Sequence, residues 1–132
     1  MATQTSEIEQ VVSRYHQAIA EKDLKTTLGC IGHGYWGDAK ATEAMKKRTV
    51  RAFKSAKTAY ANKIEFVHTT VAEKAGLALV VTIETGSSSG WGRGTLSWKG
   101  ATNLWCLTKS RGKWRIIRSV HNLGKGRASR AG

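Results

Sequence analysis

The chain has 132 residues, a hydrophobic fraction of 40% and a formal net charge of +13. This length predicts one domain, and no apolar run approaches the ~20 residues that a membrane-spanning helix needs. The opening MATQTSEIEQ lacks the basic and apolar regions of a secretory signal. We therefore expect a cytoplasmic protein without membrane association, with one domain over residues 1–124 and a basic flexible tail over 125–132. Cys30 and Cys106 lie far apart outside any CxxC motif, which favours reduced cysteines.

The first predicted element is an amphipathic helix. Ser6 and Glu9 match the S-x-x-E capping box that satisfies backbone donors at a helix start. Apolar side chains then recur every three or four residues and predict one buried stripe, made of Ile8, Val11, Val12, Tyr15 and Ile19. His16 is predicted to point away from this stripe, into solvent.

Two more helices are predicted before residue 62. Asp23 suits an N-cap and Gly29 suits a helix end, which predicts a short second helix between them. The segment HGYWGD, residues 33–38, interrupts the helices. A third helix is predicted over residues 42–61, with Tyr60 on its inner stripe and lysines and arginines on its outer face.

From residue 62 onward the apolar period changes from near 3.6 to 2, which predicts strands. KIEFVHTTVAE, LALVVTIET, TLSWKGATNLWCLTK and KWRIIRSVHNL read as four antiparallel strands joined by hairpins. Gly100 is a candidate β-bulge, and SSSGWGRG is predicted to be a loop. Helices followed by a meander indicate an α+β fold whose sheet curls around the helices and leaves one open end.

Two motifs in this order resemble the NTF2-like superfamily, which includes SnoaL-like polyketide cyclases and ketosteroid isomerases. VVSRYHQAIAEKDLKTTL is similar to the opening helices, and WCLTKSRGKWRIIRSVHN is similar to the closing hairpin. The resemblance spans about Glu7 to Asn122. It implies a cone-shaped α+β domain in which N-terminal helices pack in a strongly curled antiparallel sheet around an apolar pocket. It also implies a homodimer through the outer sheet face, but no single chemistry.

The resemblance to ketosteroid isomerases implies candidate catalytic residues. Tyr15 matches a tyrosine that donates a hydrogen bond to the substrate, and Asp38 matches the catalytic base after a one-residue gap. Asn103 falls closest to the place of a protonated aspartate, and its amide could donate the same hydrogen bond. The residues alone leave a second reading of Asp38, as a turn carboxylate capping the following helix. Tyr15 belongs to the buried stripe under either reading.

The substrate-binding candidates are Trp36, Trp98, Asn103, Trp105 and His121. Aromatic walls with a few convergent polar groups are typical of small-molecule sites. The four histidines show no metal-ligand spacing, so neither a metal nor another cofactor is expected.

We therefore expect a protein that binds a small apolar molecule, steroid-like or polyketide-like. An isomerase, cyclase or hydrolase using Asp–Tyr acid–base chemistry and a non-catalytic carrier both remain open. The alternative is a module that binds a polyanion such as nucleic acid, or another protein. It rests on the basic segment KKRTVRAFKSAK and on the absence of acidic residues after Glu84.

Overall fold

The computed structural model describes residues 3–32, 38–90, 94–123 and 129–130. Three helices come first: α1 (Gln4–Glu21), α2 (Leu24–Gly29) and α3 (Ala39–Lys54). Four long strands follow: β1 (Ala59–Ala72), β2 (Leu77–Ser89), β3 (Leu96–Ser110) and β4 (Lys113–Leu123), with a short 3-10 helix, η1 (Glu73–Ala75), after β1. This order confirms the predicted α+β class.

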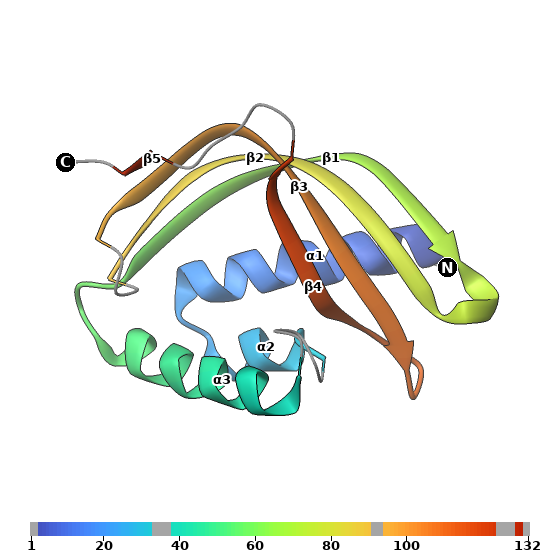
Figure 1. Cartoon of the computed structure of the whole chain (residues 1–132), viewed down its shortest axis with the longest axis horizontal. Coiled ribbons are helices and arrows are strands. Elements are labelled where there is room, and N and C mark those ends of the chain that lie inside the picture. Colours follow the sequence, from blue (N-terminus) through green and yellow to red (C-terminus); the bar gives the residue numbers. More distant parts are fainter. Residues whose placement is uncertain (1–2, 33–37, 91–93, 124–128, 131–132) are drawn as a thin grey trace.

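The strands form one antiparallel sheet in the order β1-β2-β3-β4. Figure 1 shows the sheet arched over α1, with α2 and α3 on the same concave side. The core between α1 and the sheet contains fully buried apolar side chains, among them Ile8, Val12, Val80, Leu107 and Ile116. No helix in the described residues is long and apolar enough to cross a membrane.

Three helix boundaries differ from the sequence prediction, one of them the start of the third helix, at Ala39 rather than residue 42. The N-cap of α1 is Thr3, whose side chain accepts from the Ser6 amide, so the predicted Ser6 cap lies inside the first turn. The third helix ends at Lys54 rather than residue 61, because Ser55 is already extended and the chain enters β1 at Ala59. Tyr60 therefore belongs to the sheet, where pairing with β2 satisfies its backbone instead of a helix. The Asp23 cap of α2 is confirmed.

Glycines shape the sheet at two places. The β2–β3 register shifts so that Lys99 and Gly100 oppose Thr85, and Gly100 has φ +61°, which confirms the predicted bulge. Gly86 lies within β2, where a Cβ would stand only 2.1 Å from the Ala61 carbonyl oxygen. Because β2 continues to Ser89, residues 87–89 of the predicted SSSGWGRG loop belong to a strand. Residues 91–93 lie outside the described residues.

A short strand, β5 (Ser129–Arg130), pairs with Leu96 and Ser97 of β3. This stretch of β3 lies beyond its pairing with β4, so its outer edge is open to another strand. These two residues of the segment predicted as a flexible tail thus belong to the sheet. The division of the chain at residue 124 stays a prediction.

Candidate functional site

A cavity of about 330 Å³ lies at the end of the sheet where β1 begins and β4 ends. All four long strands contribute to its wall. The aromatic and aliphatic part of its lining consists of Tyr60, Leu96, Trp98 and Ala101. The four polar residues are Glu84, Asn103, His121 and Asn122. Three of the five predicted substrate-binding residues, Trp98, Asn103 and His121, are thus brought together.

A buried ionisable pair lies at the wall of this cavity. Glu84 of β2 is 2% exposed, His16 of α1 is 4% exposed, and Oε1 of the first lies 3.2 Å from Nε2 of the second. The other ring nitrogen of His16, Nδ1, lies 2.7 Å from the Val12 carbonyl oxygen. A carbonyl can only accept, so Nδ1 carries a proton and donates it there. One further proton is then shared between Nε2 and the Glu84 carboxyl.

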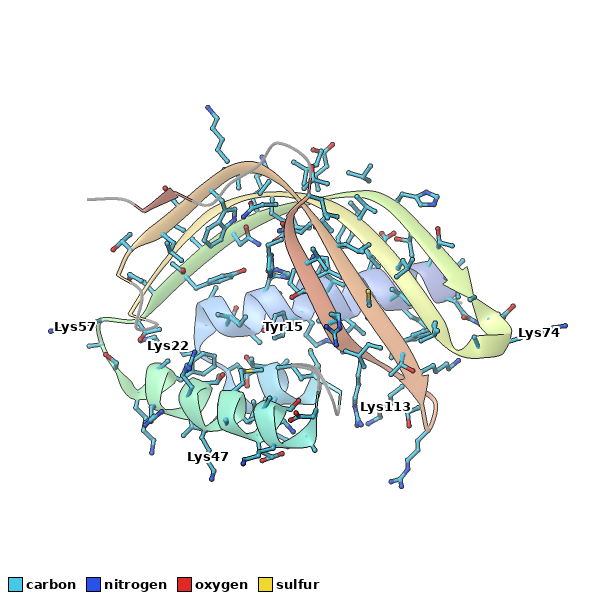
Figure 2. The ribbon with its side chains drawn as sticks, in the orientation of Figure 1. Tyr15, Lys22, Lys47, Lys57, Lys74 and Lys113 are labelled. Atoms are coloured by element: carbon cyan, nitrogen blue, oxygen red, sulfur yellow. The ribbon has the colours of Figure 1, made fainter. Side chains whose placement is uncertain are left out.

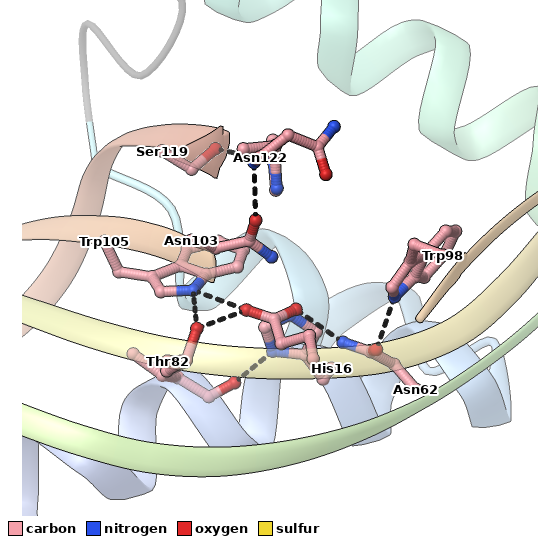
Figure 3. Close-up of polar contacts among 11 residues, drawn as sticks. His16, Asn62, Thr82, Trp98, Asn103, Trp105, Ser119 and Asn122 are labelled. Carbon is pink, nitrogen blue, oxygen red and sulfur yellow. Dashed lines mark hydrogen bonds and ion pairs between the residues drawn. The ribbon is translucent and has the colours of Figure 1, made fainter. Parts of the chain in front are cut away.

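Three more donors surround the same carboxyl group, and Figure 3 shows them converging with His16 from α1, β1, β2 and β3. The Asn62 amide donates to Oε1 at 2.6 Å. The Thr82 hydroxyl and the Trp105 indole N–H both donate to Oε2, at 2.5 and 2.9 Å. Because every one of these neighbours donates, the arrangement favours an ionised carboxylate.

The electrostatics agree with this hydrogen-bond pattern. Burial alone would raise the pKa of Glu84, since it disfavours the charged form. The hydrogen bond and positive charge of His16, with hydrogen bonds from Thr82 and Asn103, outweigh burial and hold the pKa of Glu84 well below its ordinary value. Glu84 is therefore a buried carboxylate at neutral pH that lies in contact with His16 Nε2.

His121 is the second histidine of the site, and its state differs. Its side chain lines the cavity and is partly exposed to solvent, yet desolvation by the protein around the ring still lowers its pKa from the ordinary 6.5. The Glu84 charge opposes this lowering, and the smaller effect of the His16 charge adds to it. Its ring meets Trp105 edge-on at a centroid distance of 5.5 Å, and Nε2 lies 3.2 Å from the Ser119 hydroxyl. His121 is therefore neutral at pH 7 and can accept a proton.

Hydrogen bonds fix the other polar wall residues. The Trp98 indole N–H donates to Asn62 Oδ1 at 2.8 Å, and Asn62 in turn donates to Glu84. Asn103 is 3% exposed, and its Oδ1 accepts from the Asn122 backbone amide at 3.0 Å. The wall is therefore held in place by hydrogen bonds, in part through the same network that stabilises the Glu84 carboxylate.

The structure does not bring Asp38 into this cavity. Asp38 is exposed and is the N-cap of α3, with Oδ1 accepting from the Ala41 amide at 2.7 Å. This is the capping role that the sequence left open, and the residues lining the cavity do not include Asp38. Its assignment as the base of the site therefore has no geometric support.

The remaining predicted residues lie around the cavity or outside the described part of the chain. Tyr15 is half-buried and packs edge-on against His16 and Trp105, but it does not line the cavity. Trp105 is 2% exposed and does not line the cavity, but its indole N–H donates to Glu84 Oε2. Trp36 lies outside the described residues.

Sequence reasoning missed Glu84 and placed His16 wrongly in solvent. Two signals were present. Glu84 continues the alternate positions of β2 that face inward, after Ala78, Val80 and Thr82. His16 follows Ile8 and Val12 at four-residue spacing, on the buried side of α1.

The positive charge is spread rather than concentrated at one surface. In Figure 2 the labelled Lys47, Lys57, Lys74 and Lys113 project outward from distant parts of the molecule. Within the described residues only two ion pairs occur, His16–Glu84 and Lys46–Glu43. That part of the chain also has no cluster of three His, Cys, Asp or Glu side chains suited to a metal ion.

Comparison with known proteins gives the fold. No protein-family model matches the sequence, and a search of the curated proteins found no match. A ketosteroid isomerase-like protein from Erwinia carotovora atroseptica has a TM-score of 0.65 at 14% identity, covering 92% of this chain and 96% of that one.

Two further solved structures agree. An NTF2-like protein from Cytophaga hutchinsonii has a TM-score of 0.61 at 15% identity, covering 92% of this chain and 98% of that one. The intermembrane space region of the chloroplast protein ARC6 has a TM-score of 0.60 at 14% identity, covering 94% and 98%. The chain therefore has an NTF2-like fold, as its sequence motifs implied.

Proposed function

We propose that this protein binds a small, largely apolar molecule in the cavity at the open end of its sheet. The observation that carries the proposal is the composition of the wall. Tyr60, Leu96 and Trp98 offer apolar and aromatic surface, while Asn103 and His121 offer polar groups at one side. Ligand sites typically combine these features in volumes of about 300–1,000 Å³, so a cavity of about 330 Å³ suits a compact ligand.

The neutral state of His121 favours a second step, acid–base catalysis on the bound molecule. An imidazole with a lowered pKa can take a proton at neutral pH, and Asn103 lies in the same wall to orient a substrate oxygen. The ketosteroid isomerase-like structural neighbour supports an isomerase, and the cyclase and hydrolase classes use comparable proton transfers. His121 replaces Asp38 as the proposed base.

A cavity-filling substitution tests the binding proposal. Ala101 lines the cavity and is 2% exposed, so Ala101→Leu adds bulk at the wall. Steroid-like and polyketide-like compounds are titrated against both proteins, with tryptophan emission and calorimetry as readouts. We expect saturable binding to the unmodified protein and about tenfold or weaker binding to Ala101→Leu, a change of ~1.4 kcal/mol. Ala44→Leu, on the exposed side of α3, is the matched control.

Binding that survives Ala101→Leu unchanged would place the ligand elsewhere. Where turnover of a bound compound is found, His121→Gln separates the two steps. The substitution is expected to remove turnover and to leave the dissociation constant within about threefold. Because the base form of His121 exists above its pKa, activity should fall only when the pH drops below the ordinary 6.5. Full turnover by His121→Gln would exclude His121 as the base, whereas a lack of turnover in the unmodified protein would limit it to a carrier role.

The basic surface supports the alternative proposal of a polyanion-binding module less well. Charge spread over several elements attracts polyanions without forming one site, and such attraction weakens steeply with salt. Nucleic-acid binding that persists at about 0.15 M salt and is lost on reversing Lys47 and Arg51 would favour this alternative instead.

A further inference from the structure

A second hollow lies at the other end of α1, away from the cavity. It measures about 620 Å³ and lies between the first half of α1, the helix α2 and the turn that joins β3 to β4. None of its lining residues also lines the cavity of Glu84 and His121. The two hollows are therefore separate places on the molecule.

The lining of this hollow is strongly basic. Arg14 from α1, Lys25 from α2, and Lys113 and Arg115 from β4 contribute to it, against one carboxylate, Glu7. Within the described residues none of the four basic side chains forms an ion pair. The Arg14 guanidinium opposes the rise that burial causes in the pKa of Cys30, while the smaller effect of the Asp23 charge adds to that rise. An anion in this hollow would meet cations from three elements.

A buried hydrogen-bond donor in the same wall has no acceptor. Trp114 is 6% exposed, and its indole Nε1–H has no hydrogen-bond partner in the described part of the chain. The indoles of Trp98 and Trp105 both donate to side-chain oxygens. An unpaired buried N–H is costly, so it favours any ligand oxygen that can reach it after a small side-chain adjustment.

We propose that this hollow, here called the basic groove, binds the phosphate group of a small organic phosphate. A phosphate monoester carries nearly two negative charges and three acceptor oxygens, which suits several cations and an N–H donor better than one carboxylate does. The volume of about 620 Å³ leaves room for an organic group beside the phosphate. The cations surround a hollow rather than a flat face, which favours a small molecule over a polymer.

The Trp114 indole resonance tests the proposal directly. In ¹⁵N-labelled protein at about 0.15 M salt, the resonance is assigned by its loss in Trp114→Phe. Phenyl phosphate is then titrated, with phenol as the uncharged analogue. We expect a saturable downfield shift of the Trp114 N–H with phenyl phosphate and none with phenol, while the Trp98 and Trp105 indoles stay in place.

Charge reversal at the basic groove supplies the second arm. Arg14 and Lys25 are exposed, so Arg14→Glu with Lys25→Glu leaves the core intact, which the melting temperature verifies. The double variant is expected to bind phenyl phosphate about tenfold more weakly, a change of ~1.4 kcal/mol. Lys47→Glu with Arg48→Glu, on the exposed side of α3, makes the same change in net charge and should bind as the unmodified protein does.

Three outcomes would overturn the proposal. The first is a Trp114 resonance that does not move while phosphate is present in excess. The second is equal weakening in both double variants, which would assign binding to the overall field. The third is a short oligonucleotide that shifts the same resonance at much lower concentration than any small phosphate, which would make the occupant a nucleic acid.

Discussion

Replacing Glu84 with glutamine removes the charge at the centre of the buried polar network. The carboxylate accepts from His16, Asn62, Thr82 and Trp105, and an amide of the same size can accept at only one of its two positions. The variant therefore removes the carboxylate that faces His16 and turns at least one buried donor towards another donor.

The expected cost is large. Breaking a buried ion pair by removing one partner typically lowers the free energy of unfolding by about 3–5 kcal/mol. For a domain of this length each kcal/mol shifts the melting temperature by about 3–5 °C, so we expect a fall of at least ~10 °C. Urea denaturation at pH 7 measures the free energy, and Glu65→Gln, an exposed change on β1, is the matched control.

Acid titration gives an independent signature. The pKa of Glu84 is lower in the folded than in the unfolded chain, so its stabilisation is complete above the ordinary value of 4.5. That stabilisation is lost progressively as the pH falls through and below 4.5. The unmodified protein should therefore lose more stability between about pH 5 and pH 2 than Glu84→Gln does.

A result near zero would refute the reasoning. If Glu84→Gln unfolds within about 0.5 kcal/mol of the unmodified protein and follows the same acid profile, the carboxylate is not the charged centre of the network. A double-mutant cycle with His16→Gln then distinguishes the pair from its neighbours. Direct coupling predicts an interaction energy of about 1–3 kcal/mol between the two sites.

Three further predictions concern single positions. Asp38→Ala should lower the free energy of unfolding by about 1 kcal/mol, while Asp38→Asn keeps the cap and costs little. Ligand titration should be unchanged in both variants, and weaker binding by Asp38→Asn would show that Asp38 takes part in the site. Gly86→Ala places a Cβ 2.1 Å from the Ala61 carbonyl oxygen, so we expect a loss of about 2 kcal/mol or more by thermal denaturation, and an unchanged melting temperature would contradict the close strand packing. The outer sheet face exposes Leu79 and Val120 (46% and 40%), and we propose that a homodimer forms through this face. Leu79→Lys with Val120→Lys should give a monomer by light scattering, and a monomeric unmodified protein would contradict the proposal.

The order of the elements could be predicted because local signals and tertiary contacts agree. Asp23 caps a helix in the sequence pattern and in the structure, and Gly100 forms the bulge that its freedom at positive φ allows. Alternation along the four strands matches their pairing in register. The resemblance to the NTF2-like superfamily added the cone shape, which solved structures confirm at the level of the fold.

The end of α3 could not be predicted, because the local pattern is ambiguous there. Ala52, Ala56 and Tyr60 continue a helical stripe at four-residue spacing, and the sequence between them contains no glycine or proline to end the helix. The chain instead turns at Ser55, and β1 pairs with β2 from Ala59 onward. Pairing along a whole strand outweighs a weak helical preference over one turn.

The polar network was missed because ionisable side chains are assigned to the surface by default. Tyr15 and His16 are neighbours at the edge of one helical stripe, and hydrophobicity alone assigns the inner place to the tyrosine. The structure buries His16 more deeply than Tyr15, since Glu84 supplies a counter-charge on the facing strand. The contact between the two polar side chains offsets the cost of burying them both. The two residues are 68 positions apart in sequence, so no local pattern could reveal the contact.

The same pairing decides which group in the cavity can act as a base. Glu84 is the carboxylate that lines the cavity, but four donors occupy its oxygens and its pKa is lowered, so it is a poor proton acceptor. Asp38, the carboxylate suggested by resemblance, caps α3 instead. His121 faces the same cavity and is kept neutral by desolvation, although the Glu84 charge acts against this more strongly than the His16 charge supports it. A carboxylate with a lowered pKa and a second histidine kept neutral by desolvation thus move the proposed chemistry from a carboxylate to an imidazole.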